Sequence, residues 1–151
     1  LSKREALEWF RAGVEVDYEY YPIYDSIVIF FLPRWYGDPG EVGRMIQEEV
    51  SRLGGERADW ALTRMVWSLY SHEKEGIFED HGIDYPMLKK VYEKWTSQWE
   101  DVETANYYCL YACMAGDRKA AKRMFDRIGE EFDEYCWGSE ENFRKWKKRY
   151  G

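Results

Sequence analysis

The stretch that decides the fold class is residues 105–129, "ANYYCLYACMAGDRKAAKRMFDRIG". Apolar and small residues recur in it every three or four positions, the spacing of one face of an α-helix. A Gly-Asp pair at 116–117 interrupts the pattern, as a turn between two helices would. The packing positions are small or aromatic: Cys109, Ala112, Ala121 and Phe125. Because small side chains let helices approach closely, the stretch predicts an antiparallel hairpin of helices 102–115 and 117–129.

The same helical spacing continues through the rest of the chain. Ser2 and Glu5 form a capping box at the start of the first helix, and Asp101 is a predicted cap of a later one. Helices are predicted over 3–14, 21–32, 39–53, 57–72, 85–99 and 139–149. No segment alternates with the period of two that a half-buried strand requires. The sequence therefore predicts an all-α fold, with antiparallel helix hairpins in an array of about seven or eight helices.

Length and composition predict one domain. The chain has 151 residues, and 19% of them are aromatic, which favours a core of large flat side chains. The longest apolar run, "IVIFFL" at 27–32, is far shorter than the ~20 residues of a membrane-spanning helix. Since the chain begins at Leu1 and enters a helical pattern at once, we expect it to be part of a longer protein or to have lost a leader.

Charge is spread unevenly along the chain. The net charge is -7, but residues 117–151 hold ten Lys/Arg against eight Asp/Glu, so this segment is at +2 and residues 1–116 are at -9. An acidic body fits a basic partner and argues against a dedicated nucleic-acid binder. The late basic residues could contact phosphates, or they could be solvated helix faces. They are Arg118, Lys119, Lys122, Arg123, Arg127, Arg144, Lys145, Lys147, Lys148 and Arg149.

The stretch "FFLPRWYGDPGE", residues 30–41, reads as either a structural corner or a ligand-contacting loop. Pro33 predicts the end of one helix, and Asp38 followed by Pro39 predicts the N-cap and first position of the next. As a corner, the stretch would bury Trp35 against the second and third helices. Arg34 would then lay its stem over an aromatic ring. As a loop, it offers three candidate binding residues: Arg34, Trp35 and Tyr36.

Cysteines and histidines give no metal or cofactor pattern. Cys109, Cys113 and Cys136 are predicted to be reduced and buried, and this slightly favours the cytoplasm. The two histidines do not form a second ligand pair with zinc spacing, and neither lies in a nucleophile motif. His81, in "EDHGID", is interpreted as a loop residue. The alternatives are a binding residue or a general base between acidic neighbours. We predict neither a metal nor a cofactor.

Two stretches resemble a known family: "YYPIYDSIVIFFLPRWYGD" at 20–38 and "ACMAGDRKAAKRMFDRIGEEFDEYCWGSEENF" at 112–143. They are similar to the bacterial domain-of-unknown-function family numbered 4034. In that family a helix ends in Leu-Pro-basic-Trp-Gly, and Ala-Gly-Asp, Phe-Asp-basic-Ile-Gly and Trp-Gly follow later. Here Tyr36 stands between Trp35 and Gly37, and residues 54–100 do not align. The resemblance implies a tetratricopeptide-like helical fold in bacteria, without an activity or catalytic residues.

The hairpin at 105–129 also fits one diverged tetratricopeptide unit, or a generic helical hairpin. Stacked hairpins leave a concave face for a peptide or helix, so the first functional hypothesis is a protein–protein interaction module or scaffold. A second is a carbohydrate-binding or hydrolytic helical domain that uses exposed Trp and carboxylates. A third is an acidic inhibitor of the immunity type. The sequence predicts a protein or peptide partner and leaves the oligomeric state open.

Overall fold

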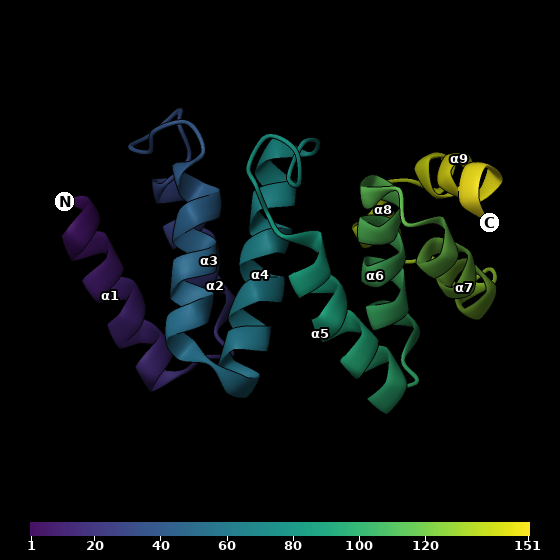
Figure 1. The fold of residues 1–151 in the computed structure, drawn as a ribbon, viewed down its shortest axis with the longest axis horizontal. Helices are drawn as coiled ribbons and strands as arrows, with labels where there is room; N and C mark the ends of the chain where they lie inside the picture. The colour runs from purple at the N-terminus through teal and green to yellow at the C-terminus, as the bar shows by residue number, and fades with distance from the viewer. The chain divides into compact units, whose positions relative to one another are not determined.

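The computed structural model describes residues 1–151 and contains nine helices and no strand, which confirms the all-α prediction (Figure 1). The chain divides into two compact units, Leu1–Asp84 and Tyr85–Gly151. None of the helices combines the length and the apolar composition needed to cross a bilayer.

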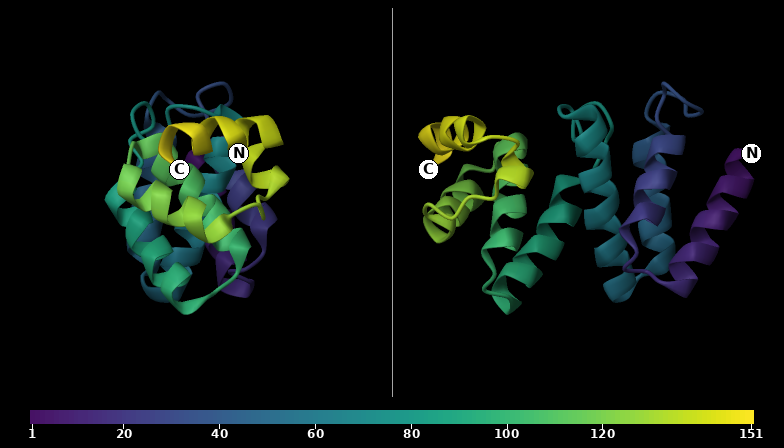
Figure 2. Two further views of the ribbon diagram at one scale, coloured as in Figure 1. Left: turned by 90° about the vertical axis from the view of Figure 1, so that its right-hand side faces the viewer. Right: turned by 180° about the vertical axis from the view of Figure 1, so that it is seen from behind.

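The first unit contains four helices: α1 Lys3–Val16, α2 Tyr21–Phe30, α3 Glu41–Leu53 and α4 Gly55–Glu73. Helix α4 packs against both α2 and α3, and α1 packs against α2. The reverse view of Figure 2 shows that successive helices run up and down, so residues 31–40 and 74–84 lie at the same end of this unit. Charged pairs join α1 to α3: Arg11 with Glu49 at 2.6 Å and Lys3 with Glu41 at 2.8 Å.

The second unit contains five helices: α5 Tyr85–Gln98, α6 Val102–Ala115, α7 Arg118–Ile128, α8 Glu134–Trp137 and α9 Glu140–Tyr150. Its most extensive contact is between α6 and α7, with α5 on α6 and α9 on α7. The Arg127 guanidinium, at the end of α7, donates to the carbonyls of Thr96 at 2.6 Å and Trp99 at 2.5 Å. It thereby satisfies carbonyls at the C-terminal end of α5 that have no intrahelical partner.

The hairpin at 105–129 has the predicted form. Asp101 and Asp117 cap the two helices, and Gly116 ends the first in a left-handed conformation with φ 74°. The Cys109 thiol lies 3.6 Å from the Ala121 carbonyl, so the small residues do bring the two backbones together. Phe125 fills the space toward α8 and α9 by stacking on Trp137 and contacting Phe143 edge-on.

One local prediction, the start of the third helix, was wrong, and one short helix was not predicted. Helix α3 begins at Glu41, after Gly40 with φ 79°, and Asp38 is not its N-cap. The left-handed Gly40 separates Asp38 from the helix, and the Asp38 carboxylate lies 3.6 Å from Lys3 and accepts no hydrogen bond from the α3 backbone, although the Asp38 backbone N–H still donates to the Glu41 carboxylate at 2.9 Å. Helix α8 was not predicted at all; the Asp133 side chain caps it by accepting from the N–H groups of Tyr135 and Cys136.

Candidate functional site

Residues 31–40 form a tight corner between α2 and α3. The backbone N–H groups of Trp35 and Gly37 both donate to the Leu32 carbonyl, at 3.0 and 3.1 Å. A Cβ atom at position 37 would lie 1.8 Å from the Phe31 carbonyl oxygen, so only glycine fits there. Phe31 and Leu32 are buried and close the end of the core beneath the corner.

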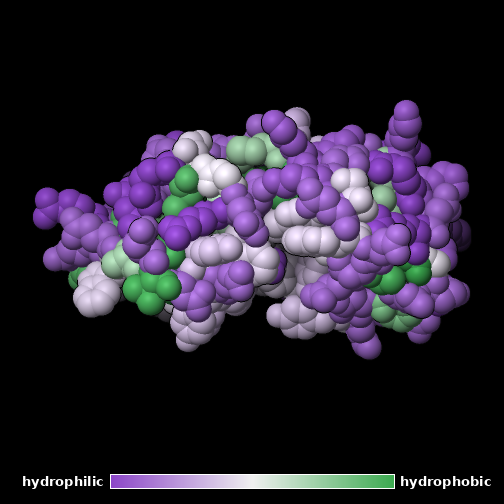
Figure 3. Space-filling view, turned by 90° about the horizontal axis from the view of Figure 1, so that it is seen from below, coloured by the Kyte–Doolittle hydropathy of each residue, from purple (hydrophilic) through white to green (hydrophobic).

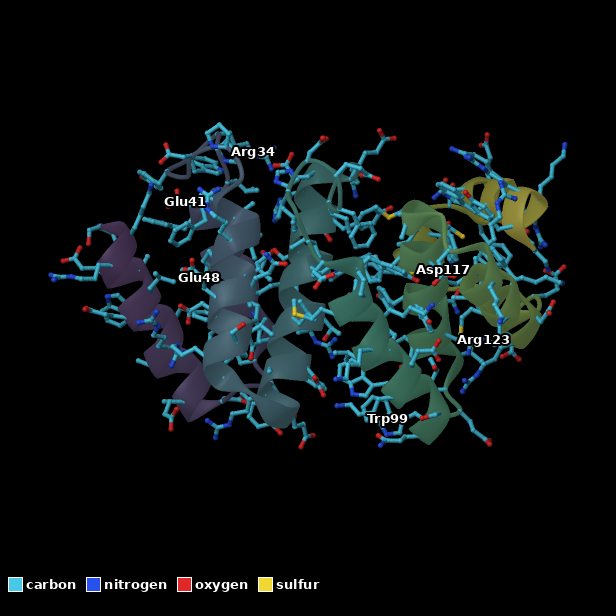
Figure 4. All side chains as sticks on the ribbon, in the orientation of Figure 1. Arg34, Glu41, Glu48, Trp99, Asp117 and Arg123 are labelled. Atoms are coloured by element: carbon cyan, nitrogen blue, oxygen red, sulfur yellow. The ribbon has the colours of Figure 1, made fainter.

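The prediction that Trp35 is buried was wrong, since 60% of this residue is exposed. Phe31 and Leu32 already fill the space under the corner, and Trp35 lies on its outer side. Tyr36 folds back instead and stacks on Phe30, with 4.7 Å between ring centroids. Arg34, seen at the tip of the corner in Figure 4, is exposed and forms neither an ion pair nor a cation–π contact. The corner therefore presents Arg34 and Trp35 to solvent.

His81 lies in the other loop at the same end of the unit, over residues 74–84. The loop is anchored by the buried Ile77 and Ile83, and its His81 carbonyl rests on Gly43 of α3, where a Cβ atom would be 1.7 Å away. His81 Nε2 is 4.0 Å from Glu73, and its buried Nδ1 has no hydrogen-bond partner. No contact joins His81 to the three corner residues, so the candidates share one end of the unit without forming one site.

An apolar groove lies between α1 and α2 of the first unit. Its volume is about 390 Å³. Apolar and aromatic side chains dominate its lining: Leu1, Ala6, Trp9, Phe10, Tyr20, Pro22, Ile23, Ser26, Ile27 and Phe30. Trp9 is 74% exposed and Tyr20 is 55% exposed. At the floor, Gly13 lets Ile23 approach so closely that a Cβ atom at 13 would be 2.7 Å from Ile23 Cδ1. The groove was not predicted from the sequence.

The sequence did contain a signal for an exposed apolar surface on α1, of which Trp9 also lines the groove. Helix α1 carries two apolar stripes at helical spacing, and only one of them, Ala6, Phe10 and Val14, is buried. The other stripe, Trp9, Ala12 and Val16, is exposed. A helix with a second, exposed apolar stripe usually has a further packing surface. Figure 3 shows hydrophobic residues at the surface at the end that carries α1.

The surroundings of the groove are acidic. Glu5, Glu8, Asp17 and Glu19 are all exposed on α1 or in the turn that follows it. Arg4 lies among them, 3.8 Å from Glu8. Residues 1–84 contain nine Lys/Arg and seventeen Asp/Glu, a net charge of -8. The groove thus has an apolar lining and lies in a unit with a negative net charge.

A Ser, an Asp and a His also meet in the first unit, which the sequence did not suggest. Asp25 Oδ1 accepts from the Ser68 hydroxyl at 2.5 Å and lies 3.2 Å from His72 Nε2. Ser68 is fully buried and donates to the carboxylate, not to the histidine. Activation of a serine nucleophile requires a base on its hydroxyl and access for a substrate. The cluster instead ties α2 to α4.

The three cysteines are free and buried. No group of three or more His, Cys, Asp or Glu side chains is arranged to hold a metal ion.

Comparisons of the chain with protein-family models, with curated proteins and with solved structures gave no match. The resemblance to family 4034 therefore stays a prediction, and the geometry alone carries the functional argument.

Proposed function

We propose that this chain is a helical-repeat protein-interaction module, and that the groove between α1 and α2 holds an amphipathic helix of a protein partner. The observation that carries the proposal is the exposed apolar groove with Trp9 on its wall. The tetratricopeptide-like array and the membership of bacterial family 4034 belong to the same proposal. The close α6–α7 packing at Cys109 and Ala121 supports the array.

The shape and chemistry of the groove favour a helix as its occupant. Tyr20, Ile23, Ile27 and Phe30 follow one another along α2 at intervals of three or four residues. They form an apolar ridge parallel to the helix axis, which matches the apolar stripe of another helix. The net charge of -8 on the first unit favours a helix whose polar face is basic, because opposite charges across an interface steer association and exclude other partners.

Trp9 is the expected centre of the binding energy. Tryptophan is enriched among residues that dominate interfaces, because it buries a large area at little conformational cost. The Trp9 side chain is largely solvent-exposed in the free chain. Nearly all of the burial of this side chain would therefore occur when the partner helix binds.

The test uses a synthetic amphipathic helical peptide of leucine and lysine. We expect it to bind in a titration that follows tryptophan fluorescence. Trp9→Ala should weaken binding about thirtyfold, the equivalent of about 2 kcal/mol. The matched control is Trp35→Ala, which removes another exposed tryptophan that does not line the groove and should leave the affinity unchanged.

Three results would contradict the proposal. One is equal affinity of the Trp9→Ala and unsubstituted chains. Another is tighter binding of a leucine–glutamate peptide of the same pattern. The third is a dimer in light scattering that Trp9→Ala dissociates, since that would assign the groove to a second copy of the chain.

A carbohydrate-binding or hydrolytic function lacks such an observation. Trp9 lines the groove, whereas Trp35 lies on the corner and Trp99 follows the end of α5. The acidic-inhibitor hypothesis shares the acidic first unit with the present proposal. It differs in requiring that binding inhibits the partner's activity.

A further inference from the structure

Helices α7 and α9 carry a concentration of positive charge that the rest of the chain does not share. Together they hold ten Lys/Arg and three Asp/Glu over 22 residues, a net charge of +7. Because the whole chain is at -7, the other 129 residues are at -14. The two helices contact one another in the second unit, which does not contain the groove.

Half of these cations are engaged within the unit. Arg123 pairs with Glu93 at 2.6 Å, Lys122 with Asp126 at 3.5 Å, and Arg144 with Glu130 at 2.7 Å. Lys147 lies near Glu130, and Arg127 binds carbonyls. The other half forms no ion pair: Arg118, Lys119, Lys145, Lys148 and Arg149. These five residues are here named the basic cluster.

Three residues of the basic cluster, Arg118, Lys145 and Arg149, lie over two aromatic rings. Trp146 and Tyr150, one turn apart on α9, stack with 5.8 Å between centroids. The Arg118 guanidinium lies over Tyr150 at 5.0 Å and thereby joins the start of α7 to the end of α9. Arg149 contacts both rings, and Lys145 lies over Trp146. A guanidinium fixed over a ring keeps its donors oriented and loses less freedom when it binds an anion.

Ion pairing within the unit does not account for the α7 part of the cluster. Arg118 and Lys119 lie in the first turn of α7, which contains no acidic residue. Cations at a helix N-terminus oppose the helix dipole, and crowded like charges repel one another. A chain with 29 acidic residues nevertheless leaves these two without a carboxylate partner. The Asp117 carboxylate caps this terminus, and the two cations beside it remain available to an anion from outside.

We propose that the basic cluster is a second interaction surface, and that it binds an acidic segment of a protein partner. The faces of Trp146 and Tyr150 are occupied by one another and by cations, so a nucleic-acid base has no open ring to stack on. The charge of -14 elsewhere on the chain also repels a long polyanion. A short segment rich in Asp and Glu matches the fixed guanidinium groups.

The test measures binding of a fluorescein-labelled oligoglutamate peptide by anisotropy, at low and at physiological salt. We expect Arg118→Glu with Arg149→Glu to weaken binding about tenfold or more, and added salt to weaken binding to the unsubstituted chain. The matched control is Arg4→Glu with Lys90→Glu, which makes the same change in net charge at exposed cations elsewhere and should keep most of the affinity.

If the charge reversals unfold the unit, a second variant, Lys119→Gln with Lys145→Gln, still tests the proposal. Both lysines are exposed, so the variant should keep its circular dichroism spectrum and still bind more weakly. The proposal is overturned if the cluster and control variants bind the peptide equally. It is also overturned if single-stranded oligothymidylate binds more tightly than oligoglutamate.

Discussion

At the scale of single residues, the corner shows which aromatic side chain is structural. Trp35 and Tyr36 are neighbours and are similarly exposed, but only Tyr36 stacks on a helix residue, Phe30. A ring stack contributes about 0.5–1.5 kcal/mol beyond the area that it buries. An exposed side chain with no such contact contributes about 0.5 kcal/mol or less.

The first prediction follows from this difference. Tyr36→Ala should lower the free energy of unfolding by about 1 kcal/mol, and Trp35→Ala should leave it within about 0.5 kcal/mol. Urea denaturation of both variants measures this. A larger loss for Trp35→Ala would show that Trp35 packs against the helices in solution, as the sequence had suggested.

Glu49 is the most buried carboxylate of the first unit. Its side chain is 3% exposed, and it accepts from Arg11 at 2.6 and 3.1 Å and from Arg52 at 3.0 Å. Burial raises the pKa of Glu49, but the hydrogen bonds and charges of Arg11 and Arg52 more than offset it and leave the pKa below its ordinary value. A depressed pKa in the folded chain contributes stability above the unfolded pKa, and this stability is lost as the pH falls.

The second prediction is a pH dependence that Glu49 controls. Glu49→Gln should cost about 3 kcal/mol at neutral pH, the low end for a broken buried ion pair, because solvent reaches both arginines. It should also flatten the loss of stability below the ordinary glutamate pKa of about 4.3. Glu48→Gln, an exposed neighbour on α3, is the control (Figure 4). Parallel pH profiles for Glu49→Gln and the unsubstituted chain would refute this account.

At the scale of helices, α8 depends on one buried amide from a distant part of the chain. Asn106 of α6 accepts at Oδ1 from Trp137 Nε1 at 2.8 Å and from the Asp133 backbone at 3.1 Å. Its amide nitrogen donates to the Val102 and Glu131 carbonyls. All four hydrogen-bonding positions of the amide are used, and three of them fix the segment that leads into and forms α8.

The third prediction concerns this amide. Asn106→Ala should destabilise the chain by about 2–4 kcal/mol, because it leaves several buried polar groups without partners. Asn142→Ala, which removes one side-chain hydrogen bond at a half-buried position, should cost about 1 kcal/mol. Thermal unfolding compares the two. Equal costs would mean that water replaces Asn106 in the variant.

These contacts explain what the sequence could and could not predict. Ser2 with Glu5, Asp101 and Gly116 act within three or four residues, so the helices they bound were predicted closely. Helix α8 depends on Asn106, about 30 residues earlier, and no local pattern reports that contact. The outward direction of Trp35 depends on Phe31 and Leu32 filling the core below it. The exposed stripe of Trp9, Ala12 and Val16 could have been read as a candidate surface, but the first helix was interpreted from its buried face.

At the scale of the whole molecule, the two units differ in charge and in chemistry. The first unit is at -8, and the second, with thirteen Lys/Arg and twelve Asp/Glu, is at +1. Length alone predicted one domain and could not show this division. The two proposed surfaces follow it, since the groove lies in the acidic unit and the basic cluster in the other. A salt titration should therefore weaken both kinds of binding, whereas Trp9→Ala should affect only the first.

All three cysteines lie in the second unit, so their reactivity reports on the opening of that unit alone. Cys109, Cys113 and Cys136 are at most 2% exposed. Burial raises the pKa of Cys109 and of Cys136 well above the ordinary thiol value. Because the thiolate is the reactive form, these thiols should react only when the unit opens.

The last prediction is that a thiol reagent labels the native cysteines at least about a hundredfold more slowly than an exposed cysteine, since labelling requires an opening that costs several kcal/mol. Ser51→Cys on α3 provides the exposed reference at a position with no side-chain hydrogen bond. In guanidinium all thiols should react at similar rates, because unfolding removes the protection. The packing of α6 against α7 keeps the Cys109 thiol buried, since this thiol lies against the Ala121 carbonyl. Fast labelling of Cys109 in the native chain would therefore contradict the hairpin from which the fold was first inferred.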